Sequence, residues 1–186
     1  MRLILILCMF YTSAIQAAEY TSVDSIQFEI KSENITEKLE RTMKNPEPLL
    51  LRFRPEGAVI TRKEVSSNSM SFVATKNVLF ISKSVNVKTQ LDIQENSLGC
   101  GPEMVGYNFV LSVDGSDSFV TNNVDHLEAK LCVKIFNNQK IVGTVRGKIF
   151  KGHNFSRALG PVAINMIEAQ VAPLIRALSE EIKLMK

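Results

Sequence analysis

Apolar and polar residues alternate in this chain from Val78 to Lys151, and this alternation predicts a series of half-buried antiparallel strands. It is clearest in the second half of a strand region at residues 70–93. One face of that stretch carries Leu79, Ile81, Val85, Val87, Leu91 and Ile93. A shorter alternation at residues 22–30 predicts an edge strand, and residues 49–53 and 58–65 predict two further short strands.

A first hairpin is predicted where the apolar face of residues 105–113 meets the turn sequence Asp-Gly-Ser-Asp at 114–117. Centring the hairpin on this turn places Cys100 opposite Cys132, on the face away from the apolar side chains. The pattern at residues 119–125 suggests a bulge, which would shift that register.

A second hairpin is predicted around Asn138, because apolar residues occupy every second position on both sides of it. Centring this hairpin on Asn138 pairs Ile135 with Ile141. The same register puts Gly143 and Gly147 on the inward face. Small residues at such positions either permit sharp curvature of the sheet or leave room for a bound molecule.

An amphipathic helix is predicted between the edge strand and the later strands. Its apolar residues recur at four-residue spacing, at Ile35, Leu39 and Met43. Asn34 is placed to cap the helix, with Glu37 as the return half of a capping box. Pro46 and Pro48 end it, since proline lacks an amide hydrogen and restricts the residue before it.

A second, longer amphipathic helix is predicted at the C-terminal end, from Pro161 to Lys186. Its apolar stripe consists of Ile164, Ile167, Val171, Leu174, Ile175, Leu178 and Ile182. Pro161 suits the first turn of this helix. Pro173 interrupts its middle and is expected to kink it.

The N-terminus has the pattern of a secretory signal peptide. Arg2 precedes an apolar stretch at residues 3–11, and small residues follow up to a cleavage site after Ala17. The apolar stretch is too short to span a bilayer, which takes about 20 residues. We therefore expect residues 1–17 to be removed and residues 18–186 to form one domain, periplasmic or secreted, with no transmembrane anchor.

Composition and charge limit the class of protein and the kinds of partner to be expected. The chain has 186 residues, of which 45% are hydrophobic and 22% charged, and this composition is typical of a globular domain. The net charge is only +3 and no Lys/Arg block occurs, so no nucleic-acid partner is expected. In an oxidising compartment Cys100 and Cys132 favour a disulfide, with buried free thiols as the alternative.

Catalytic motifs are absent from the sequence: it contains no G-x-S-x-G, H-E-x-x-H or C-x-x-C. His126 and His153 could join the two cysteines in a zinc site, but their spacing matches no finger pattern. We therefore predict no catalytic residue, no metal and no cofactor. Tyr107 and Thr89 are polar groups on inward faces, where they would bond either a ligand or the backbone.

The order of these elements resembles the helix-grip fold of the START-domain and polyketide-cyclase superfamily. The resemblance rests on the strand at 22–30, the helix at 34–44, the strands between 49 and 151, and the helix from Pro161 onward, and it is topological only. It implies an α+β fold in which a curved antiparallel sheet wraps around the last helix, with an apolar cavity between them. Members bind lipids, sterols or polyketides, and some are cyclases or aromatases. A lipocalin-like barrel is the alternative fold, although lipocalins place their strands before any helix.

The resulting functional expectation is an exported binder or carrier of a hydrophobic, lipid-like small molecule. The residues expected to line its site are Val87, Leu91, Tyr107, Phe109, Leu131, Val145, Ile167 and Val171. A cyclase-type enzyme acting on a hydrophobic substrate and an interaction module with a filled core are the alternatives. A fully packed interior would exclude the binder.

Overall fold

The computed structural model describes residues 20–54, 56, 59–78, 81–155 and 169–185. Its strands are β1 (Tyr20–Lys31), β2 (Val59–Ser66), β3 (Ser69–Val78), β4 (Ile81–Glu95), β5 (Val105–Val113), β6 (Val124–Phe136) and β7 (Lys140–Lys151). Its helices are α1 (Ile35–Lys44), α2 (Glu47–Arg52), α3 (Ser118–Asn123) and α5 (Val171–Leu184).

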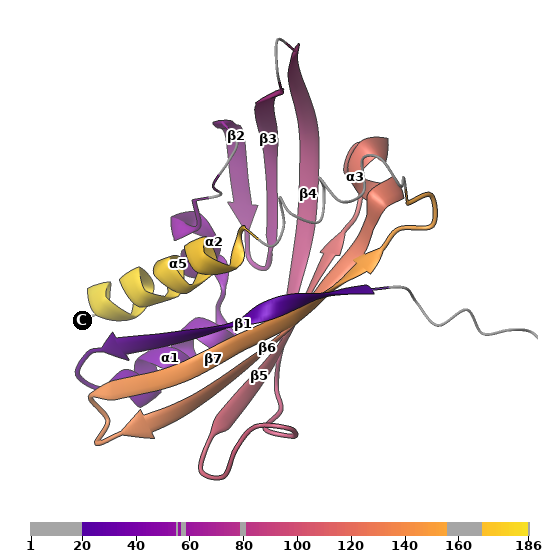
Figure 1. Cartoon of the computed structure of the whole chain (residues 1–186). Helices are drawn as coiled ribbons and strands as arrows, with labels where there is room; N and C mark the ends of the chain where they lie inside the picture. The colour runs from indigo at the N-terminus through magenta and orange to yellow at the C-terminus, as the bar shows by residue number, and fades with distance from the viewer. Residues whose placement is uncertain (1–19, 55, 57–58, 79–80, 156–168, 186) are drawn as a thin grey trace, which may run out of the picture.

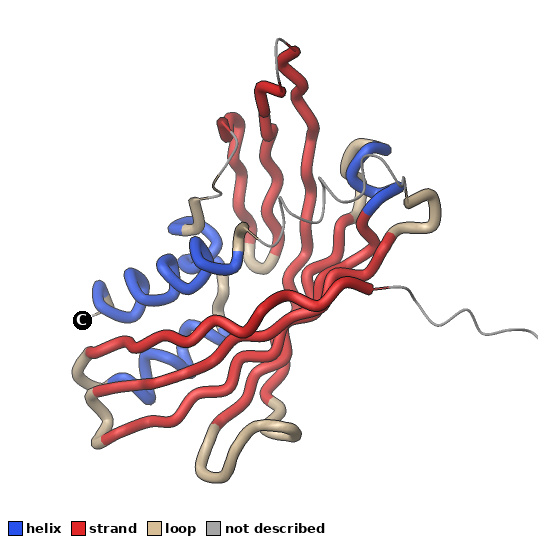
Figure 2. Tube along the Cα trace, viewed as in Figure 1, coloured by secondary structure: helices blue, strands red, loops and turns tan. Residues whose placement is uncertain are grey.

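The seven strands form one sheet in the order β1-β7-β6-β5-β4-β3-β2, and every neighbouring pair is antiparallel. The sheet is strongly bent, so that α5 lies between its two edge strands and next to α2 (Figure 1). Figure 2 shows the same arrangement by secondary structure, with α1, α2 and α5 gathered at one end of the sheet. This is the expected α+β helix-grip architecture, an open sheet with β1 and β2 at its edges rather than a lipocalin-like barrel.

The first helix follows the prediction in its extent but not in its cap. Its buried residues are Ile35, Leu39, Thr42 and Met43. Asn34 stands at the N-cap position with a φ of 50°, yet its side chain makes no cap hydrogen bond. The turn between β6 and β7 supplies the acceptors instead, through Asn138.

Residues 49–53 were predicted as a strand, and this is wrong, because residues 47–52 form α2. The helix starts directly after Pro46, with Pro48 in its first turn, where a missing amide hydrogen removes no intrahelical bond. Leu49 and Leu50 are buried. A short apolar run suits a buried helix face as well as a strand, so its pattern does not decide between them.

The predicted register of the first hairpin is also wrong. Cys132 pairs with Gly106, six positions beyond the expected partner Cys100. The cause is α3, whose six residues follow the turn and take up chain that the hairpin would otherwise have used. The register of β6 against β7 is also irregular between Val124 and His126, which fits the disturbance expected at residues 119–125.

The second hairpin has the predicted register, with Ile135 opposite Ile141 and Gly143 opposite Val133. The space beside Gly143 is filled by another side chain. A Cβ at this glycine would lie 2.5 Å from Cζ of Phe28 on the edge strand. Gly143 therefore accommodates Phe28, and the space beside this glycine is not open to a bound molecule.

Within the described residues the C-terminal helix α5 starts at Val171, after a turn at Ala169 and Gln170. Pro173 lies in the first turn of α5, where proline is tolerated. The kink predicted at Pro173 concerns a longer helix, part of which falls outside the described residues. The predicted start at Pro161 lies outside the described residues.

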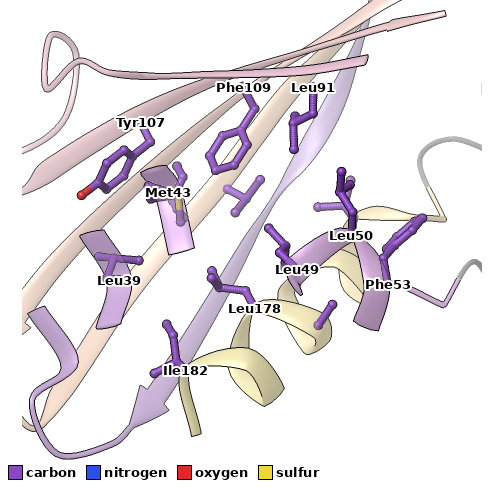
Figure 3. Packing of buried hydrophobic residues seen from close by; sticks show 14 of the residues in the cluster. Leu39, Met43, Leu49, Leu50, Phe53, Leu91, Tyr107, Phe109, Leu178 and Ile182 are labelled. Carbon is purple, nitrogen blue, oxygen red and sulfur yellow. The ribbon is translucent and has the colours of Figure 1, made fainter. Parts of the chain in front are cut away.

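A continuous apolar core joins the helices to the inner face of the sheet. Figure 3 shows part of it, with Leu178 of α5 near Leu49 of α2. Its most deeply buried large side chains are Ile30, Ile35, Leu39, Leu49, Leu131, Ile141, Ile149 and Ile182. The half of the sheet near α1 is thus packed, and unfilled space remains nearer to β2, β3 and β4.

Candidate functional site

A cavity of about 210 Å³ lies between the inner face of the sheet and the helices α2 and α5. The side chains around it are apolar except for Glu56, Thr89 and Gln170. Its apolar lining consists of Leu50, Phe53, Ile60, Met70, Phe72, Ala74, Val85, Val87, Leu91, Phe109, Leu111, Val113, Phe119, Val120, Val124, Leu127, Ala129, Val145, Val171 and Leu174. The interior is therefore not fully packed.

The alternation of the strands is what turns these side chains inward. Phe72 lies opposite Val87, and Ala74 lies opposite Val85, so that each cross-strand pair presents two apolar side chains to the cavity. Helix α2 closes one side with Leu50.

Five of the eight residues expected to bind a ligand line this cavity, namely Val87, Leu91, Phe109, Val145 and Val171. Ile167 lies outside the described residues. Leu131 and Tyr107 are buried in the core instead and are not among the lining residues.

Tyr107 points away from the cavity. In Figure 3 its hydroxyl is directed away from Phe109 and Leu91, and its ring lies near Met43. Burial raises the pKa of Tyr107 to about 12, and the carboxylates of Glu95 and Glu40 add to the rise. The phenol is therefore neutral at physiological pH, at the α1 end of the core.

Two parts of the lining were not predicted from the sequence. Leu50 and Phe53 belong to a segment predicted as a strand, and Phe119 and Val120 belong to α3, which was not predicted. The closely spaced prolines Pro46 and Pro48 are the signal that favours a helix start for the first pair. We find no comparable signal for α3.

The polar groups of the lining are engaged within the protein. The hydroxyl of Thr89 donates to the carbonyl of Met70 at 3.3 Å. The backbone N–H of Glu56 donates to the side-chain oxygen of Gln170 at 2.9 Å, and the amide nitrogen of Gln170 donates back to the carbonyl of Glu56 at 3.1 Å. The carboxylate of Glu56 also pairs with Arg176. These bonds join the segment after α2 to α5 at the rim of the cavity.

Two cationic side chains fix the position of α2. Arg52 forms an ion pair with Glu181 of α5, whose side chain is buried. The ammonium group of Lys63 donates to the carbonyls of Leu50 and Phe53 at 2.6 and 2.7 Å, and so caps the C-terminal end of α2. Burial lowers the pKa of Lys63 to about 8, with a further contribution from a neighbouring arginine.

The predicted disulfide is present. Cys100 and Cys132 are bonded, with their Cα atoms 5.6 Å apart, although they are not cross-strand partners. The bond ties the loop between β4 and β5 to the outer face of β6. Because both sulfurs are used, the zinc site considered from the sequence does not form.

No cluster of three or more His, Cys, Asp or Glu side chains in the described chain is arranged to hold a metal ion. Within the same residues, no helix has the length and apolar character needed to cross a membrane.

Comparison with known proteins gives structural matches only. No protein-family model matches the sequence, and no curated protein matches it. Norcoclaurine synthase from Thalictrum flavum aligns at 12% identity and a TM-score of 0.47, covering 97% of this chain and 96% of its own. A START superfamily protein from Mycobacterium smegmatis aligns at 9% identity and a TM-score of 0.45, covering 87% of this chain and 97% of its own. The Zhui aromatase/cyclase from Streptomyces sp. R1128 aligns at 10% identity and a TM-score of 0.42, covering 88% of this chain and 92% of its own.

Proposed function

We propose that this protein is an exported binder or carrier of a hydrophobic, lipid-like small molecule, held in the cavity between the sheet and the helices α2 and α5. The observation that carries this proposal is the cavity itself, which is lined by apolar side chains from six strands and three helices. Ligand sites are commonly concave and apolar, with few polar groups.

The volume of the cavity suits a small apolar ligand. An engineered apolar cavity of about 150 Å³ stays dry and binds benzene. The cavity here, at about 210 Å³, has room for a somewhat larger molecule or for one arm of a longer one. Burial of the ligand's apolar surface would drive binding, at about 25 cal/mol per Å² removed from water.

The proposed contact residues follow from the lining. They include the five predicted residues that face the cavity, together with Leu50 and Phe53 beside α2. Ile167 remains proposed from the sequence pattern alone. Met70 adds an unbranched, adaptable side chain that can adjust to ligands of different shape.

Export is proposed on two grounds. Residues 1–17 have the charge, length and small-residue pattern of a signal peptide. The disulfide between Cys100 and Cys132 is of the kind that persists in oxidising compartments. On this proposal residues 18–186 are the mature protein and form a single domain.

Native mass spectrometry of the protein purified from its own host tests the proposal. We expect a one-to-one non-covalent complex with a small apolar molecule, lost on denaturation. The variant Ala74→Phe, which places a ring in the cavity, should purify without that molecule. Val73→Phe on the opposite face of β3 is the matched control and should retain it. An equal amount of ligand in both variants would contradict a site in this cavity.

A further inference from the structure

A second hollow, of about 560 Å³, lies on the outer face of the sheet, away from the apolar cavity. Its lining comes from β1, β4, β5, β6 and β7, and includes Phe109, Val110, Ala129 and Gly147. Its polar lining consists of Ser22, Ser25, Gln94, Asn108, Glu128, Lys130, Arg146 and Lys148. This surface differs from the inner cavity in both charge and polarity.

Two of its cations lie directly opposite each other. Lys130 on β6 pairs with Arg146 on β7 in the strand register. Like charges at directly opposed positions of an antiparallel pair destabilise the sheet. The row continues across β5 and β4, because Asn108 pairs with Lys130 and Gln94 pairs with Asn108. Four neighbouring strands thus present two cations and two amides side by side.

The disulfide-tied loop holds both cations in place. The ammonium group of Lys130 donates to the carbonyl of Asn96, and the guanidinium of Arg146 donates to the carbonyl of Gly99 at 2.7 Å. The bond between Cys100 and Cys132 fixes this loop to β6. Each cation retains further N–H donors, since an ammonium has three and a guanidinium five. Their positions are therefore set before any ligand arrives.

The hollow has three cationic side chains and one carboxylate, that of Glu128, which lies opposite Lys148 in the strand register. Within the described residues, Lys130, Arg146 and Lys148 form no ion pair with a carboxylate, and Lys148 lies 4.5 Å from the ring centroid of Tyr20. Two other lysines on the same strands do have carboxylate partners, at Glu103 and Glu29. The one acidic residue of the hollow, Glu128, has its carboxylate 3.6 Å from a histidine nitrogen.

We infer that this hollow binds a small soluble anion that carries at least two carboxylate or phosphate groups. Arg146 offers paired N–H donors that match the geometry of a carboxylate or phosphate, and Lys130 adds a point charge beside it. Asn108 can donate from its amide group to a second anionic group further along the row. The amide nitrogen of Gln94 already donates to the carboxylate of Asp92 at 2.9 Å and has one further N–H to offer. A bound anion would also offset the repulsion between the two opposed cations.

Isothermal titration of the folded protein at low salt tests the inference, with citrate and inorganic pyrophosphate as probes. We expect saturable one-to-one binding of at least one probe. Arg146→Gln and Lys130→Gln should each weaken that binding by about tenfold, the loss expected for one charge-assisted contact. Lys183→Gln removes an exposed charge from α5 and is the matched control, expected to bind within about twofold of the parent protein. Thermal unfolding of each variant confirms that it is folded.

Three outcomes would overturn the inference. One is the absence of saturable binding of either probe to the folded parent protein. Another is equal affinity in Arg146→Gln, Lys130→Gln and Lys183→Gln. The third is binding to vesicles of equimolar phosphatidylglycerol and phosphatidylcholine without binding of either soluble probe, which would indicate attraction to a charged surface. None of these outcomes bears on the apolar cavity, so the proposed function is tested separately.

Discussion

The side-chain oxygen of Asn138, in the turn between β6 and β7, accepts a hydrogen bond of 2.9 Å from the backbone N–H of Thr36 at the start of α1. The backbone carbonyl of Asn138 also accepts from the N–H of Ile35, at 3.2 Å. A residue 102 positions away in the sequence therefore caps this helix, in place of the adjacent Asn34. The hairpin turn and the helix are coupled, and together they fix one end of the structure.

Replacing Asn138 by glycine should remove the side-chain hydrogen bond of this cap while keeping the backbone conformation. Asn137 and Asn138 have φ values of 50° and 54°, so glycine relieves similar strain at both positions. We expect Asn138→Gly to be less stable than Asn137→Gly by about 1 kcal/mol, the usual cost of losing an N-cap. Urea unfolding of the two variants measures the difference. Equal stabilities would show that the Asn138 side chain does not cap α1.

Any side chain at Gly106 is expected to destabilise the protein, because the disulfide-tied loop packs directly against this residue. A Cβ at this position would lie 2.2 Å from the carbonyl oxygen of Asn96 and 2.7 Å from Sγ of Cys100. Gly106→Ala should therefore destabilise the protein by about 2 kcal/mol, as overpacking does. At Gly101 the nearest atom is the flexible sulfur of Met104, at 3.1 Å. Gly101→Ala is thus the control, and urea unfolding measures both variants. A loss of stability in Gly101→Ala as large as that in Gly106→Ala would contradict the predicted clash.

The ion pair between Arg52 and Glu181 should stabilise the contact of α2 with α5. The side chain of Glu181 is 9% exposed and that of Arg52 is 35% exposed, so the pair is partly shielded from water. We expect Glu181→Gln to lower the free energy of unfolding by about 2 kcal/mol. This is less than the loss for a fully buried ion pair, because the side chain of Arg52 remains partly exposed to water.

The exposed pair of Glu37 and Arg41 on α1 provides the comparison. Glu37→Gln should cost less than about 0.5 kcal/mol, since exposed pairs contribute little. Urea unfolding at low salt checks both values. A cost for Glu181→Gln no greater than that for Glu37→Gln would mean that this ion pair does not hold α2 against α5.

Much of the fold could be predicted because alternation and turn chemistry act locally. The second hairpin had the right register, since Asn137 and Asn138 both adopt the positive φ of a tight turn. The first hairpin did not, because residues 118–123 form a helical turn that no local pattern announces. The disulfide was predicted correctly from two cysteines in an oxidising compartment, although the hairpin register that placed them opposite each other was wrong. Its true cause is a loop that folds back over Gly106, a tertiary contact outside the reach of sequence spacing.

The candidate cavity could be predicted only in part, for a related reason. Inward-facing strand residues such as Val87 and Leu91 follow from alternation alone. Whether an inward residue meets a cavity or a neighbouring side chain depends on which helix covers it. Tyr107 lies toward α1, its cross-strand partner is Leu131, and both are packed in the core. Phe72 and Ala74 instead line the cavity. The pattern on a strand carries no information about that difference.

The central claim is that the apolar cavity binds a hydrophobic ligand, and fluorescence titration with N-phenyl-1-naphthylamine tests it most directly. This probe is uncharged and so should not enter the cationic hollow on the outer face. We predict saturable one-to-one binding to the parent protein and to Val73→Phe, and binding at least about tenfold weaker in Ala74→Phe, where the new ring occupies the site. Equal binding by a folded Ala74→Phe, or no binding to the parent protein, would contradict the claim.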